Sequence, residues 1–129
     1  YHNIGEASKI TGISAKMIRH YEDIGLIPAA SRTFAGYRLY GEADLHRLRF
    51  IKRGRSLGFS IKDIEALLGL WGNPARASRD VKRLAQAHVD ELERKIQEMQ
   101  AMQRSLRDLA SRCHGDLRPE CPVLDDLAR

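Results

Sequence analysis

Two cysteines near the C-terminal end are the residues of this sequence best suited to chemistry. Cys113 and Cys121 have seven residues between them, and a loop of that length can place two sulfurs on opposite sides of one ion. Two soft sulfur ligands suit Cu(I) and its congeners Ag(I) and Au(I), whereas Zn(II) normally takes four ligands. Two alternatives stay open here: Cys113 is a small apolar packing residue, or His114 joins a zinc site.

Composition excludes several other kinds of site. Two cysteines are too few for a disulfide scaffold, and the sequence has no CxxC, no Ser/His/Asp order and no phosphate-binding loop, so we expect no enzyme activity. No run of about 18 apolar residues is present, as a membrane span requires. We expect a soluble, cytoplasmic protein that does not bind membranes.

The positive charge is concentrated in the first half of the chain. Residues 1–60 hold ten Lys/Arg against five Asp/Glu, whereas residues 61–129 hold twelve of each. Because Lys and Arg release counterions from phosphates, this half favours a nucleic-acid partner; an ordinary solvated basic surface is the alternative.

The elements that carry this charge are two short helices and a hairpin. Residues 4–10 and 14–22 form helices around a turn at Gly12, and Ser14 is placed to cap the second helix. Six apolar or aromatic residues of these helices can form one buried face: Ala7, Ile10, Ile13, Met17, Ile18 and Tyr21. Three basic residues then point outward: Lys16, Arg19 and His20. This is helix-turn-helix geometry with the second helix as the reader.

The hairpin is predicted over residues 32–40, turning near Gly36. It carries Arg32 and Arg38 together with tyrosines. Such a ribbon beside a reading helix is a wing, where arginines meet phosphates.

A second pair of helices and one long helix follow. The pair covers about residues 42–55 and 60–70, with a capping-box pattern at Ser60 and Asp63. Residues 79–112 contain no Gly or Pro, and apolar residues recur there with heptad spacing; the two seam series are Ala85, Leu92, Met99, Leu106 and Cys113, and Val89, Ile96, Gln103 and Ala110. The pattern predicts a coiled-coil homodimer, parallel or antiparallel.

Three segments together resemble the MerR family of transcription regulators: residues 18–22 (Ile-Arg-His-Tyr-Glu), 25–27 (Gly-Leu-Ile) and 36–40 (Gly-Tyr-Arg-Leu-Tyr). The cysteine loop is similar to that of the copper(I)-responsive, CueR-type branch. The resemblance implies a mainly α fold with three parts: a winged helix-turn-helix domain over 3–71, a long antiparallel coiled-coil dimerisation helix over 75–112 and a metal-binding loop over 113–129. It implies a homodimer that, with Cu(I) bound, distorts double-stranded promoter DNA so that RNA polymerase activates copper efflux and detoxification genes.

The resemblance also assigns residues. It implies DNA contacts by Lys16, Arg19 and Tyr21 of the reading helix, by Tyr37 and Arg38 of the wing, and by Arg55; the role of His20 stays open because some relatives have Phe there. It implies metal ligation by Cys113 and Cys121. Ser78 and Lys82 match positions that the partner subunit brings over the metal loop, where Ser78 sets selectivity and Lys82 offsets the net negative charge of two thiolates and one monovalent ion.

Two alternative functions retain the DNA-binding role and differ in what the cysteines do. One is a MerR-type regulator with another effector: Ag(I), Au(I), Zn(II) or an oxidant. The other is an architectural DNA-binding protein whose cysteines are inert and whose transcriptional output ignores metal.

Overall fold

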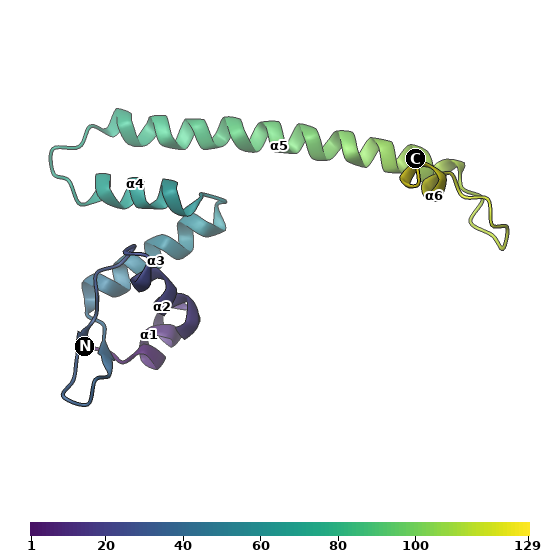
Figure 1. Cartoon of the computed structure of the whole chain (residues 1–129). Coiled ribbons are helices and arrows are strands. Elements are labelled where there is room, and N and C mark those ends of the chain that lie inside the picture. The colour runs from purple at the N-terminus through teal and green to yellow at the C-terminus, as the bar shows by residue number, and fades with distance from the viewer. The chain divides into compact units, whose positions relative to one another are not determined.

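The computed structural model describes all of residues 1–129 and divides into two compact units, Tyr1–Leu84 and Ala85–Arg129. The first unit contains α1 (Ile4–Thr11), α2 (Ala15–Asp23), β1 (Ser31–Arg32), β2 (Arg38–Leu39), α3 (Glu42–Ser56) and α4 (Ile61–Trp71). The helix α5 (Ser78–Arg112) begins in the first unit and continues into the second, which ends with α6 (Pro122–Leu127). The expected mainly α architecture with one small hairpin is confirmed (Figure 1). None of the helices combines the length and the apolar character that a membrane span requires.

The helix starts follow from local capping. The Ser14 hydroxyl accepts a hydrogen bond from the Met17 N–H at 3.2 Å, and the Ser60 hydroxyl accepts one from the Asp63 N–H at 3.1 Å. Each bond satisfies one backbone donor that the first helical turn leaves unpaired. A full reciprocal capping box occurs instead at α1, where Asn3 and Glu6 exchange bonds of 2.8 and 3.1 Å.

The core of the first unit lies between α1, α2, α3 and α4. Leu45, Leu48 and Ile51 of α3 are fully buried and pack with Ile18 of α2 and Ile64 of α4. Their spacing of three residues keeps them on one face of α3. A single apolar cluster therefore fixes the four helices relative to one another.

Two residues expected in this core are exposed. Ile10 is 42% exposed and Met17 is 38% exposed, so that part of the sequence prediction is wrong. In α1 the buried face runs through Ala7 and Thr11, whose hydroxyl donates to the Ala7 carbonyl at 2.8 Å. With positions 7 and 11 at the centre of the buried face, position 10 lies about 80° from that centre, at the edge of the face, because each residue rotates the side chain by about 100°.

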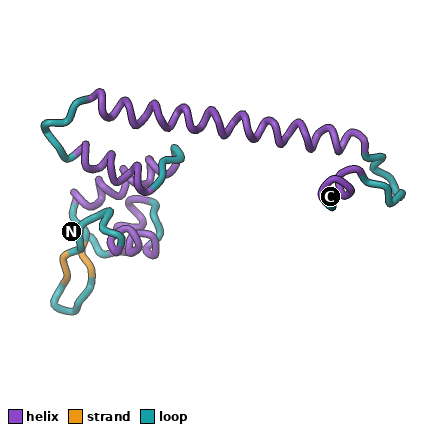
Figure 2. Tube along the Cα trace, turned by 45° about the horizontal axis from the view of Figure 1, so that its top comes forward, coloured by secondary structure: helices purple, strands orange, loops and turns teal.

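The hairpin pairs β1 and β2 antiparallel, with Ser31 opposite Leu39 and Arg32 opposite Arg38. Gly36 has φ +85°, the left-handed conformation that glycine adopts without strain, so the chain reverses where the sequence predicts. Figure 2 shows the hairpin extending from the helices of this unit. Its base is extended by His2, which exchanges backbone hydrogen bonds of 2.8 and 2.7 Å with Tyr40.

Candidate metal centre and nucleic-acid interface

The two cysteines lie side by side in the second unit. Cys113 follows the last residue of α5, and Cys121 is the N-cap of α6. Their Sγ atoms are 3.8 Å apart, both thiols are free, and both residues are partly buried. The seven-residue loop between Cys113 and Cys121 therefore brings the two sulfurs together, as their spacing predicts.

The start of α6 makes the Cys121 sulfur more acidic. The backbone N–H of Leu124 lowers the pKa of Cys121 below that of an ordinary thiol, and hydrogen bonds from the Cys113 thiol and the Val123 N–H act in the same direction. Burial and the negative charge of Asp125 oppose this shift. Since thiolate is the form that binds metal, this lowering favours a metal-binding role for Cys121.

The donor set decides which ions the residues fit. No group of three or more His, Cys, Asp or Glu side chains within the chain could hold a metal ion, so the Cys113 and Cys121 thiols stand as a pair. Soft ions bind thiolates, and a +1 ion such as Cu(I) accepts two of them. A structural Zn(II) ion would lack two ligands. The pair therefore fits a soft monovalent ion better than a divalent one.

Ser78 and Lys82 are not brought to the cysteines within one chain. Ser78 is the first residue of α5, Lys82 lies one turn later, and Cys113 follows the end of this 35-residue helix. At 1.5 Å per residue such a helix is about 50 Å long. Any role of Ser78 or Lys82 at the metal loop needs a second subunit, and it stays a prediction.

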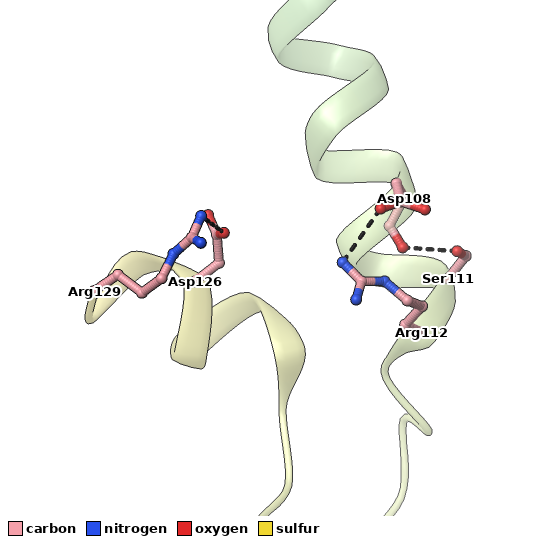
Figure 3. Close-up of polar contacts among 5 residues, drawn as sticks. All are labelled: Asp108, Ser111, Arg112, Asp126 and Arg129. Atoms are coloured by element: carbon pink, nitrogen blue, oxygen red, sulfur yellow. Dashed lines mark hydrogen bonds and ion pairs between the residues drawn. The ribbon is translucent and has the colours of Figure 1, made fainter.

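Beside the thiols, α6 and the end of α5 line an open cleft of about 560 Å³. Leu109 is the one buried residue of α5, and it lines this cleft together with Pro122. The nearby charges pair locally: Arg112 with Asp108 at 3.2 Å within α5, and Arg129, just beyond the end of α6, with Asp126 at 2.9 Å (Figure 3). Neither of these ion pairs joins α6 to α5.

The reading helix α2 presents a basic, exposed face. Lys16, Arg19 and His20 are exposed, as the sequence predicts. Tyr21 is only 6% exposed and belongs to the core cluster. Its contact with DNA stays a prediction, and its burial leaves little of its surface for that contact.

The wing residues differ in their exposure to solvent and in their polar contacts within the chain. Tyr37 is exposed, and Arg32 is exposed but donates through Nη1 to the Gly36 carbonyl at 2.9 Å, which braces the hairpin turn. Arg38 is mostly buried, with Nε 3.2 Å from Glu22 Oε2. Beyond the wing, Arg55 is exposed and donates to the Phe59 carbonyl at 2.9 Å, which holds it at the turn between α3 and α4.

Sequence reasoning missed the groups that tie these elements together. Glu22 contacts Arg38 and Tyr40, and Lys52 of α3 donates through Nζ to the Thr11 carbonyl at the end of α1, at 3.3 Å. The one available signal was Glu22 itself, because an acidic residue in the last turn of a helix opposes the helix dipole and needs another reason to be there.

A helix-turn-helix with an exposed basic reading helix, flanked by a hairpin wing, defines the class of winged helix-turn-helix DNA-binding proteins. Comparison with protein families agrees. Residues 3–40 match the family model "MerR family regulatory protein", and residues 45–109 match the model "MerR, DNA binding". The chain belongs to the MerR family of transcription regulators, and the resemblance seen in its sequence is confirmed.

Known relatives cover almost the whole chain. "Heavy metal-dependent transcription regulator 2" of Rhizobium meliloti (strain 1021) is 56% identical over 126 residues, which are 98% of this chain and 86% of the relative. The HTH-type transcriptional regulator CueR of Escherichia coli O157:H7 is 39% identical over 98% of this chain and 93% of its own. Among solved structures, the transcription regulator PbrR691 from Ralstonia metallidurans CH34 in complex with lead(II) superposes with a TM-score of 0.84 at 34% identity, covering 98% of this chain and 99% of that one.

Proposed function

We propose that this protein is a Cu(I)-responsive transcription activator that works as a homodimer on promoter DNA and switches on copper efflux and detoxification genes. The observation that carries the proposal is the pair of free thiols 3.8 Å apart with no third ligand in the chain. The relative named as heavy metal-dependent, at 56% identity, supports a metal effector of some kind. The resemblance to the CueR-type branch supports copper among the metals.

In this proposal Cys113 and Cys121 hold the ion, which supplies one positive charge and two bonds that close the loop. Two thiolates and one monovalent ion leave a net charge of −1, which a buried site must offset. Lys82 and the positive end of α5 near Ser78 can supply this if the partner subunit presents them. Ser78 would then exclude divalent ions, because its neutral hydroxyl is a poor third ligand.

The output is a change in the promoter, and α6 is the part of the chain that transmits it. Closing the loop fixes Cys121, the N-cap of α6, and so restrains Val123, Leu124 and Leu127, of which Leu124 and Leu127 are largely exposed in the single chain. We propose that these side chains pack near Trp71 and the long helix of the dimer and change the spacing of the two reading helices. A coupling of about 1–3 kcal/mol is enough for such a switch.

The test is transcription reconstituted with RNA polymerase under reducing, anaerobic conditions. Cu(I), Ag(I), Au(I), Zn(II) and Hg(II) are compared with wild type, Cys113→Ser and the matched loop control His114→Ala. We expect activation by the monovalent ions in wild type and His114→Ala, and none in Cys113→Ser. A stronger response to Zn(II) or Hg(II) than to Cu(I) would remove the copper assignment, and a response to no metal would favour an architectural role.

The second candidate is a transcription regulator that responds to a divalent ion such as Pb(II). PbrR691, solved with lead(II), supports it, because PbrR691 shares the fold over nearly the whole chain. A divalent ion needs more donors than this pair of thiols offers in one chain. Adding Pb(II) to the same transcription assay decides between the two candidates.

A further inference from the structure

Glu22, near the end of the reading helix, is buried where an acid is unfavourable. It stands in the last turn of α2, where the helix dipole disfavours negative charge. Its side chain is only 8% exposed, and burying a carboxylate costs free energy unless partners compensate. Its partners therefore explain its presence.

Both carboxylate oxygens of Glu22 bind the base of the wing. Oε1 accepts a hydrogen bond from the Ala30 N–H at 3.3 Å, just before β1. Oε2 accepts one from the Tyr40 hydroxyl at 3.0 Å, just after β2, and lies 3.2 Å from Arg38 Nε. One side chain of the reading helix thus joins both ends of the hairpin.

The pairing with Arg38 leaves part of the guanidinium free for another anion. Arg38 Nε is buried, and its N–H is not aligned for a hydrogen bond although the carboxylate is within ion-pair distance. The Arg38 side chain keeps 23% of its surface exposed. A guanidinium has five donors in a fixed fork, so one edge can face Glu22 while another meets a phosphate.

We propose that Glu22 is a positioning residue for DNA binding: it holds the wing against the reading helix and orients Arg38 toward a phosphate of the duplex. This inference rests on the proposed contact between Arg38 and DNA. Glu22 itself touches no DNA.

The direction in which DNA affinity changes when Glu22 is replaced distinguishes a positioning role from a purely electrostatic one. Removing a carboxylate close to a polyanion strengthens binding if charge alone matters. Losing an oriented phosphate contact weakens binding instead. Glu22→Gln therefore has opposite expected outcomes under the two explanations.

The experiment measures binding of the full-length dimer, without metal, to a labelled duplex that the wild-type protein enriches from a random-sequence pool. Fluorescence anisotropy over a series of salt concentrations gives the Kd and its salt dependence. We expect Glu22→Gln to weaken binding about tenfold, as loss of one charge-assisted hydrogen bond does. The slope of log K against log[salt] should become shallower by up to about one unit per subunit. The control Asp23→Asn removes an exposed carboxylate next to Glu22 and should bind as tightly as wild type, or more tightly.

A mutant cycle with Arg38→Ala tests whether Glu22 acts through Arg38. If it does, the double variant binds no more weakly than Arg38→Ala alone, whereas independent effects multiply. Thermal unfolding by circular dichroism identifies variants that are folded at the assay temperature. If Glu22→Gln is not folded, Arg38→Lys replaces it: it keeps the charge but loses the fork that Glu22 orients, and we expect about a tenfold loss.

The outcomes separate this inference from the function on which it rests. If the wild-type protein enriches no duplex, the proposed DNA-binding function fails first. If wild type binds and folded Glu22→Gln binds as tightly or more tightly, or if the losses of Glu22→Gln and Arg38→Ala multiply, the positioning role is overturned and DNA binding stands. With the replacement variant, wild-type affinity in Arg38→Lys overturns the positioning role in the same way.

Discussion

At the scale of single residues, Tyr40 joins the wing to the core. Its ring is fully buried, and its hydroxyl donates to Glu22. Burial, the hydrogen bond to Glu22 and the negative charge of Glu22 together raise the pKa of Tyr40 from 10 to about 12. The folded protein thus holds the phenolic proton more tightly than the unfolded chain does.

This shift gives stability a dependence on alkaline pH. A raised pKa in the folded state contributes stability that is complete below pH 10 and is lost as pH rises toward 12. The loss attributable to Tyr40 should be about 2–3 kcal/mol at most. We expect urea unfolding between neutral pH and pH 12 to show it in wild type and in the control Tyr37→Phe, whose ring is exposed. Tyr40→Phe should be less stable at neutral pH and should lack this part of the decline; an equal decline in Tyr40→Phe contradicts the assignment.

Gly12, between α1 and α2, is a second residue whose type is dictated by conformation. Its φ is +74°, and a Cβ there would clash with Lys52 Nζ, which donates to the Thr11 carbonyl. Gly12→Ala forces a left-handed alanine and displaces the lysine, so we expect a loss of about 1–2 kcal/mol.

Gly69, in α4, is the matched control for Gly12. A Cβ at Gly69 meets nothing within 4 Å, so Gly69→Ala should stabilise the helix by about 0.5–1 kcal/mol. Urea unfolding of both variants measures the difference. Equal effects at the two positions would refute the role assigned to the left-handed turn.

Single residues also show which contacts can be predicted from the sequence and which cannot. The spacing of Cys113 and Cys121 predicts a pair, because a short loop must return the chain, and the sulfurs are indeed 3.8 Å apart. The contacts of Glu22 with Ala30, Arg38 and Tyr40 depend on the packing of a hairpin onto a helix eight to eighteen residues away. No local pattern encodes such a contact.

At the scale of elements, α5 exposes a long apolar stripe in the single chain. Val89, Leu92, Ile96, Met99 and Leu106 are all exposed, and they follow the heptad series. An exposed apolar stripe of this length on a helix indicates a partner surface. A second copy of α5 is the partner that the repeat predicts.

The seam can be tested at Ile96. Ile96→Glu places a charge in the predicted interface of both subunits and should weaken dimerisation at least about a hundredfold. Burial of each isoleucine side chain contributes about 1.5–3 kcal/mol, and the dimer loses two. The control Gln97→Glu changes a neighbouring exposed position off the seam and should leave the dimer intact. Sedimentation equilibrium gives both dissociation constants, and a dimer unaffected by Ile96→Glu would place the interface elsewhere.

The boundaries of α1 to α4 were predicted within one or two residues because they depend on local capping, whereas α6 was not predicted as a helix. Ser14 and Ser60 cap α2 and α4 as their sequence positions indicate. The faces of the short helices were predicted less well: Ile10 and Met17 are apolar yet exposed. In helices of eight or nine residues a few apolar side chains do not define the buried face, and tertiary packing decides it.

At the scale of the whole molecule, the proposed switch separates metal binding from its readout. In the proposal Cys113 and Cys121 bind the ion, whereas α6 carries the response through Leu124 and Leu127. Leu124→Ala with Leu127→Ala removes the apolar side chains of α6 and leaves both thiols in place. The control Arg129→Ala removes a charge just beyond the end of the same helix, where Arg129 pairs only with Asp126.

This separation predicts a variant that binds Cu(I) and does not respond to it. Cu(I) at about a hundred times its Kd should stabilise wild type, Arg129→Ala and the double leucine variant alike, by about 2.7 kcal/mol in thermal unfolding. Promoter distortion, followed by energy transfer between labels at the two ends of the duplex, should change on Cu(I) addition in wild type and Arg129→Ala only. Promoter affinity should change less than about tenfold in all three, because the free energy of Cu(I) binding is used to deform DNA that is already bound. A double leucine variant that still distorts the promoter would show that the signal reaches the reading helices by a path other than α6.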